Sequence, residues 1–153
     1  MSARHEEIRA LKDAVAYGVA GDPDAGVALL QPLVDAGRLS TFALLCSLAE
    51  VAAFTALQNR RPGEAFAMSV ESTATGRAAS AEAMPVSLRF VGQFVTSWAN
   101  RDQDTAFALF KSLADEADRT GSTDLGDAIG LVYGMAVATA AEAARAHRER
   151  GCR

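Results

Sequence analysis

Three phrases of this chain follow one pattern: AGDPDAGVALL at 20–30, NRRPGEAFAMS at 59–69 and NRDQDTAFALF at 100–110. They begin 39 and then 41 residues apart, and each passes from a polar start to an apolar end. Polar turn-forming residues followed by apolar residues at helical spacing mark the start of a helix after a turn. Three such phrases at near-equal spacing predict three helix–turn–helix units of about 40 residues each.

Apolar residues at helical spacing flank each phrase on both sides. We predict a longer helix before each phrase, at 5–20, 41–58 and 86–100, and a shorter one after it, at 23–36, 63–73 and 103–119. A last helix is expected at about 124–148, and no stretch alternates with the period of two that a half-buried strand requires. The predicted fold class is all-α, with about seven helices. Three stacked hairpins (about 5–36, 40–75 and 85–119) would form an α-α superhelix, and the last helix would cap it.

Composition and charge narrow the classes of protein that this chain can represent. Its 153 residues, half of them apolar and 22% charged, suit a single soluble domain spanning 1–153. The net charge of −4 argues against a nucleic-acid partner, which needs a dense basic face. The longest apolar run, at 41–57, is shorter than the ~20 residues of a membrane span and contains Glu50 at its middle, so no membrane partner is expected. Two distant cysteines give no disulfide framework, which favours the cytoplasm.

The sequence contains no recognisable motif for catalysis or cofactor binding. The two histidines, His5 and His147, stand near opposite ends of the chain, whereas a metal site needs several convergent ligands. No nucleophile elbow, phosphate loop or dinucleotide fingerprint occurs. The letters DEAD at 115–118 are interpreted as a solvated acidic helix end, since the phosphate loop that accompanies this motif in helicases is missing. We therefore expect no enzyme, no cofactor and no metal.

The hairpin pattern resembles the tetratricopeptide family. In that family a small residue enters the second helix of each hairpin and a large apolar residue follows four positions later. Gly26 with Leu30 and Ala106 with Phe110 match this pattern, while Ala65 with Ser69 matches only its first half. The period here is longer than is usual for the family, and the closing proline is missing. The resemblance covers about 5–119; an irregular helical bundle is the alternative architecture.

The resemblance implies a non-enzymatic scaffold that binds a protein or peptide on the concave face lined by the first helices of the hairpins. The polar residues of those helices that would line this face are Ser47, Glu50, Arg89, Gln93 and Ser97. An alternative function is a helical bundle that binds a small apolar ligand in a regulatory role, with Glu50 as a polar anchor. A carboxylate within an apolar helix needs a partner, so Glu50 could instead pair with Arg89 or Arg77 inside the fold.

Small residues recur every four positions in the last helix, at Gly126, Gly130, Gly134 and Ala138. Such a stripe allows another helix to approach closely. We expect it to pack on the preceding hairpin as a cap, and the alternative is a face for a homodimer.

Overall fold

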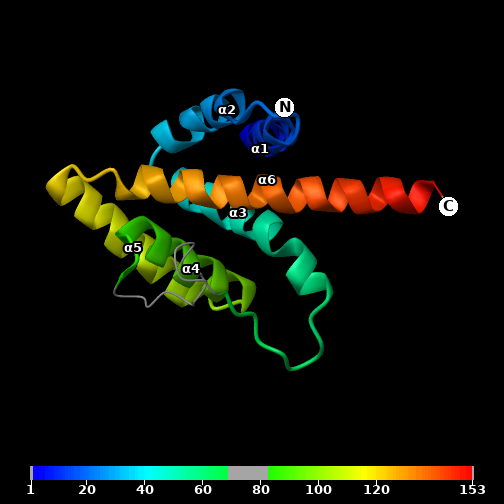
Figure 1. Ribbon diagram of the computed structural model, residues 1–153. Coiled ribbons are helices and arrows are strands. Elements are labelled where there is room, and N and C mark those ends of the chain that lie inside the picture. The colour runs from blue at the N-terminus through cyan, green and yellow to red at the C-terminus, as the bar shows by residue number, and fades with distance from the viewer. Residues whose placement is uncertain (1, 69–82, 153) are drawn as a thin grey trace. The chain divides into compact units, whose positions relative to one another are not determined.

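The computed structural model of the protein describes residues 2–68 and 83–152 (Figure 1). Within these residues the chain forms helices and no strand. The helices are α1 (Ala3–Val19), α2 (Pro23–Asp35), α3 (Arg38–Gln58), α4 (Val86–Ala99), α5 (Gln103–Thr120) and α6 (Asp124–Gly151). The all-α prediction is confirmed, and the boundaries of these helices lie within a few residues of those expected. The described residues contain six helices rather than the expected seven.

The chain divides into two compact units. The first unit comprises Met1–Thr55 and Val132–Arg153 and contains the α1–α2 hairpin, most of α3 and most of α6. The second unit comprises Ala56–Leu131 and contains the α4–α5 hairpin. The expectation that residues 1–153 form a single domain stays a prediction.

The two helical hairpins begin their second helices in the same way. The Asp22 carboxylate accepts a hydrogen bond from the Ala25 amide, and the Asp102 carboxylate accepts one from the Thr105 amide, each at 3.2 Å. Each aspartate therefore satisfies one of the amides left without a partner at a helix start. The side-chain hydroxyl of Thr105 and then its amide lower the pKa of Asp102, because hydrogen bonds to the carboxylate stabilise its charged form. Phrases one and three of the sequence are thus the capped turns of two hairpins.

The backbone of these two turns also matches bond for bond, with each residue of the second standing 80 positions after its counterpart. The amide of Asp22 donates to the carbonyl of Tyr17 at 2.9 Å, and the amide of Asp102 donates to the carbonyl of Ser97 at 2.8 Å. The residue before the cap has a positive φ in both turns, 93° at Gly21 and 61° at Arg101. Because only glycine adopts this conformation without steric cost, the first turn is the less strained of the two.

The middle phrase does not form the predicted turn and helix. Residues 63–68 are not helical, so the predicted helix at 63–73 is wrong over that stretch; residues 69–73 lie outside the described part of the chain. Arg61 occupies the position of the capping aspartate, and a guanidinium has no acceptor to offer the first amides of a helix. Instead, the Asn100 side chain binds both backbone groups of Phe66, accepting from its amide at 2.7 Å and donating to its carbonyl at 3.0 Å.

The first unit is held together by a close crossing of three helices at Tyr133 of α6. The Tyr133 hydroxyl donates to the carbonyl of Ala14 in α1 at 2.6 Å, and the side chain is only 3% exposed. Gly26 of α2 makes room for this contact, since a Cβ there would lie 2.5 Å from the Ala14 carbonyl oxygen and against the Tyr133 hydroxyl. Gly18 of α1 has the same role beneath Tyr133 and Val137. Burial raises the pKa of Tyr133.

The hairpin of the second unit packs through aromatic and small side chains. The rings of Phe90 and Phe94 stack on α4 with their centroids 5.3 Å apart. Ala106 and Phe110 of α5 are fully or almost fully buried. Their counterparts Gly26 and Leu30 are buried in the first hairpin. The small-then-large pairs found in the sequence are therefore core positions in both hairpins.

Helix α3 is both long and apolar. By length and composition it is apolar enough to cross a membrane, although 39% of that stretch is buried within the protein. Its buried residues are Thr41, Leu44, Leu45, Cys46, Leu48, Ala49 and Ala53. Burial raises the pKa of the Cys46 thiol to about 12. A buried, protonated thiol packs as a small apolar side chain rather than acting as a nucleophile.

Candidate functional site

The start of α3 is held against the end of α2 by a buried polar side chain. Thr41, which is 3% exposed, donates its hydroxyl hydrogen bond to the carbonyl of Gly37 at 2.8 Å and lies 3.3 Å from the carbonyl of Val34. Both carbonyls also accept backbone amides, that of Val34 from Gly37 and that of Gly37 from Thr41. The buried Thr41 hydroxyl therefore finds its own hydrogen-bond partners at the junction of α2 and α3. This contact sets where α3 leaves the first hairpin.

A groove of about 280 Å³ lies between α1 and α3. It is lined by Arg4, Glu7, Ile8, Leu11, Leu33, Ser40, Ala43, Leu44 and Ser47. The lining residues of each helix recur at positions i, i+3, i+4 and i+7, at 4, 7, 8 and 11 on α1 and at 40, 43, 44 and 47 on α3. Residues at this spacing share one face of a helix. Each of the two helices therefore contributes one stripe, two turns long, to the hollow, which we call the α1/α3 groove.

The groove has an apolar floor and one charged edge. Ile8, Leu11, Leu33 and Leu44 supply large apolar side chains, and Ile8 remains 43% exposed. Arg4 and Glu7 stand one turn apart on the α1 edge, whereas Ser40, Ala43 and Ser47 leave the α3 edge uncharged. On the other side of Ile8, a shallower hollow is lined by His5, Arg9, Lys12 and Asp13. Ile8 is therefore a surface residue between two hollows rather than part of the core.

A second hollow of the first unit lies between α3 and α6. It measures about 340 Å³ and is lined by Glu50, Val51, Phe54, Thr139, Ala140 and Ala143. The Thr139 hydroxyl donates to the carbonyl of Ala52 at 2.9 Å and so is satisfied within the fold. Phe54 is 46% exposed at this hollow. The surface offered to a ligand is therefore almost wholly apolar.

The structure distributes the predicted site residues over several places. Ser47 lies on the α1/α3 groove and is exposed, whereas Glu50 lines the α3/α6 hollow. Arg89, Gln93 and Ser97 are on α4 in the second unit, where Gln93 is exposed and the other two are half-buried. Their role in binding stays a prediction.

Sequence reasoning missed the α1 side of the groove. Ile8 and Leu11 were recognised as part of an apolar helical face, but such a face is ordinarily assigned to the core. Arg4 and Glu7 precede them at the spacing of the same face. The helical spacing of these four residues therefore indicated one shared face of α1. That this face lines a groove depends on the packing of α3 beside it, which the spacing does not reveal.

The glycine stripe of α6 is exposed. Gly126, Gly130 and Gly134 each have no described neighbouring atom within 4 Å of where a Cβ would stand. Among the described residues, the expectation that the stripe packs on the preceding hairpin is therefore wrong at Gly126 and Gly130, which belong to the same unit as that hairpin.

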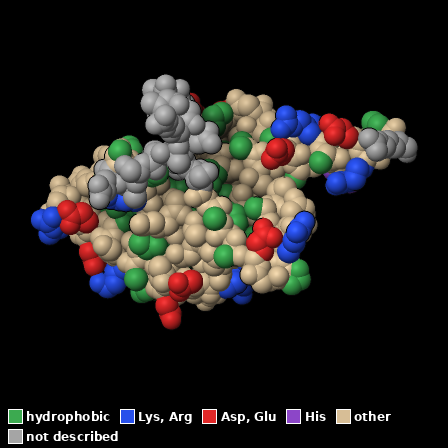
Figure 2. Space-filling view, turned by 60° about the horizontal axis from the view of Figure 1, so that its bottom comes forward, with side chains coloured by type: hydrophobic (Ala, Val, Ile, Leu, Met, Phe, Trp, Pro, Cys, Tyr) green, Lys and Arg blue, Asp and Glu red, His purple; other side chains and the backbone are tan. Residues whose placement is uncertain are grey.

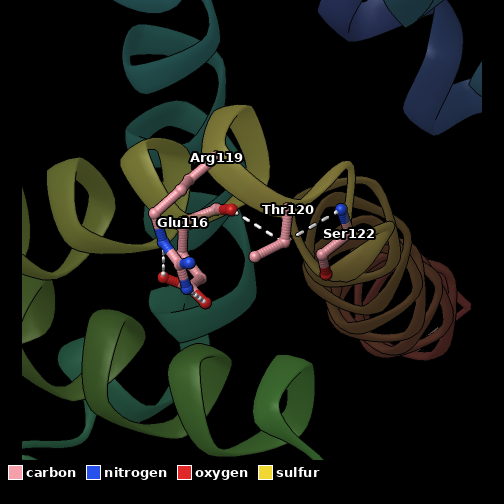
Figure 3. A network of polar contacts seen from close by, with 4 residues as sticks. All are labelled: Glu116, Arg119, Thr120 and Ser122. Carbon is pink, nitrogen blue, oxygen red and sulfur yellow. Dashed lines mark hydrogen bonds and ion pairs between the residues drawn. The ribbon is translucent and has the colours of Figure 1, made fainter.

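The acidic end of α5 is a helix terminus built from local contacts (Figure 3). Arg119 forms an ion pair with Glu116 at 2.6 Å, and the Thr120 hydroxyl donates to the Glu116 carbonyl at 2.8 Å. The Ser122 amide donates to the Thr120 hydroxyl oxygen at 3.3 Å. The letters DEAD thus belong to an exposed helix end, as interpreted. Among the described residues, no group of three or more histidine, cysteine, aspartate or glutamate side chains could hold a metal ion.

Charged side chains are mixed on the surface. On the face shown in Figure 2, acidic and basic side chains are interspersed and do not gather in a field of one sign. Comparisons of the chain with protein-family models, with curated proteins and with solved structures found no match.

Proposed function

We propose that this protein is a non-enzymatic binding module that holds a protein or peptide partner in the α1/α3 groove. The observation that carries the proposal is the pair of matching stripes on α1 and α3, which line a hollow of about 280 Å³ with an apolar floor and a polar rim. Binding sites commonly combine these two features, because apolar area supplies affinity and a few polar groups fix orientation.

The architecture that we propose for this module is a short tetratricopeptide-like array. The two capped turns with the same hydrogen bonds support it, as do the buried pairs Gly26 with Leu30 and Ala106 with Phe110. In such an array the first helices of successive hairpins line a shared face. On this proposal α1 and α3 would be the first helices of successive hairpins, and the groove that they line would belong to the shared face.

A blocking variant tests the proposal. Ala43 is exposed and lines the groove, so Ala43→Trp fills it without disturbing the core. Ala28 is exposed on α2 and outside the lining, which makes Ala28→Trp the matched control. A displayed library of random 16-residue peptides is selected on the immobilised full chain. We expect the enriched peptides to lose at least tenfold in affinity for Ala43→Trp and to bind Ala28→Trp as they bind the unchanged protein. Peptides that bind both variants equally would contradict the groove proposal.

The α3/α6 hollow favours a second candidate function, the binding of a small apolar ligand. Its lining, about 340 Å³ in volume with Phe54 half-exposed, suits a ring or a short alkyl chain. An environment-sensitive apolar dye is the probe. If this hollow binds it, Ala140→Trp abolishes the fluorescence increase, whereas Ala28→Trp leaves it unchanged.

A further inference from the structure

Helix α6 has a buried side and an exposed side along its 28 residues (Figure 1). The buried side carries Ala128, Ile129, Val132, Tyr133 and Ala136. The exposed residues of the other side, which we call the α6 face, are Gly126, Asp127, Gly130, Leu131, Gly134, Ala138, Glu142 and Arg145. We propose that the α6 face binds the α6 face of a second copy of this chain, with the two helices antiparallel about a two-fold axis. This proposal does not depend on the α1/α3 groove.

Small residues form the middle of the α6 face. Gly130, Gly134 and Ala138 are exposed there, and Leu131 beside them is 39% exposed. Glycine weakens a helix relative to alanine. Gly26 has a packing reason, the close approach of Tyr133, whereas no described atom stands within 4 Å of where a Cβ of Gly130 or Gly134 would be. Small residues at a contact between helices allow their backbones to approach closely, which gives these glycines a reason once a second helix is present.

Charge complementarity selects a second copy of the chain as the occupant. The first turn of α6 is acidic, with Asp124 and Asp127, and its C-terminal part carries Arg145 and Arg148. When two copies lie antiparallel with Gly134 of one opposite Ala138 of the other, Asp127 lies opposite Arg145. The same register places Asp124 opposite Arg148. Because a two-fold axis repeats every contact, opposite charges then meet at both ends of the pair.

The same charges disfavour other arrangements of the two helices. A parallel pair in register would place Asp127 against Asp127 and Arg145 against Arg145, and like charges repel. Sliding the antiparallel helices by seven residues keeps the same seam in contact. In either direction, however, this slide removes the contacts of both Asp124 and Asp127 with arginine. The antiparallel register with Gly134 opposite Ala138 is therefore the favoured one.

The size of the contact indicates a weak dimer. From Asp127 to Arg145 the α6 face spans about 27 Å at the rise of an α-helix. Apart from Leu131, the side chains between its charged ends are small or polar. Such a contact buries less apolar area than an obligate dimer does. We therefore expect the chain to be monomeric at about 5 μM and largely dimeric at about 500 μM.

Sedimentation velocity of the full chain over this concentration range measures the dimer. Gly134→Gln places a bulky polar side chain in the middle of the α6 face and should weaken the dimer at least tenfold. Gly92→Gln is the matched control, because it makes the same change within α4 at another glycine with no described atom within 4 Å of a Cβ. It should leave the dissociation constant within twofold of that of the unchanged protein.

Charge reversal tests the orientation and the register. Asp127→Arg and Arg145→Asp should each weaken the dimer about tenfold, because each puts like charges together at both ends of the pair. An equimolar mixture of the two variants should form a heterodimer as stable as the unchanged dimer, since opposite charges again face each other at both ends. Recovery in the mixture also shows that neither variant has lost its fold.

Three results would overturn the proposal. A chain that stays monomeric at about 500 μM has no such dimer. A dimer that Gly134→Gln leaves unchanged is held by another surface. A dimer that Gly134→Gln weakens, but whose affinity neither charge reversal changes, does not have the antiparallel register. None of these results bears on the α1/α3 groove.

Discussion

Gly26→Ala gives the sharpest test of the packing in the first unit. In an exposed helix this substitution ordinarily stabilises a protein by about 0.5–1 kcal/mol, because glycine loses more backbone entropy on folding. At position 26, however, the new Cβ would lie 2.5 Å from the backbone oxygen of Ala14, 2.9 Å from Cζ of Tyr133 and closer still to its hydroxyl. Relieving such contacts costs roughly 1–3 kcal/mol. We expect a net destabilisation of about 1–2 kcal/mol.

Gly134→Ala is the matched control, since it makes the same change in α6 where no described atom stands within 4 Å. It should raise the free energy of unfolding by about 0.5–1 kcal/mol. Urea unfolding followed by circular dichroism at 222 nm measures both variants. Trp98, the only tryptophan of the chain, lies on α4, so its fluorescence follows the second unit separately.

A double-mutant cycle identifies the clashing atom. Tyr133→Phe removes the hydroxyl that lies nearest the new Cβ, together with its bond to Ala14, which is worth about 1 kcal/mol. In that background Gly26→Ala should cost less than in the unchanged protein, because part of the overpacking is gone. If Gly26→Ala stabilises the protein as much as Gly134→Ala does, the close crossing at Tyr133 is wrong.

Two further predictions concern titratable groups. The lowered pKa of Asp102 means that its cap stabilises the fold above the ordinary carboxyl range and that this contribution is lost as the pH falls through the folded-state pKa. Asp102→Ala should therefore have a lower melting temperature than the unchanged protein at pH 7, and the two melting temperatures should converge at low pH. Asp104→Ala serves as the control, because it removes a carboxylate of the same helix turn that makes no cap bond. The raised pKa of Cys46, about 12 in the folded protein, means that its thiol stabilises the fold below the ordinary thiol pKa and that this contribution is lost at higher pH, as the unfolded thiol ionises. At pH 8 iodoacetamide should modify the exposed Cys152 and leave the buried Cys46 unmodified until urea unfolds the protein. Mass spectrometry measures the labelling of each cysteine. Equal labelling of both cysteines in the folded protein would contradict the burial of Cys46.

Local patterns predicted the helices well where capping chemistry and periodicity agreed. Asp22 and Asp102 stand before apolar helical stretches, and both helices begin one residue after their aspartate. The middle phrase, at 59–69, keeps the periodicity but has Arg61 in place of the aspartate, and residues 63–68 are not helical. The helix was predicted there from the hydrophobic spacing alone. A helix start also needs hydrogen-bond acceptors for its first amides, and Arg61 offers none.

The candidate site was less predictable than the helices. Ser47 was placed on a binding face, and it does lie on the α1/α3 groove, but Glu50, three residues further along α3, lines a different hollow. Helical phase tells which residues share a face and says nothing about which neighbour covers that face. The carboxylate within an apolar run drew attention to Glu50, while the groove depends mainly on residues of α1 that resemble ordinary core positions.

Capping aspartates, helical periodicity and the repeated phrases were sufficient for the all-α class and for the two hairpins, because each of these signals acts over a few residues along the chain. The close crossing at Tyr133 brings together Ala14, Gly26 and a residue more than a hundred positions later, and the α1/α3 groove joins positions 4–11 to positions 40–47. Contacts of this kind depend on the packing of side chains in three dimensions, where volumes must fit and buried polar groups must find partners. The tertiary structure alone therefore decided which apolar stripe became core and which became the wall of a groove.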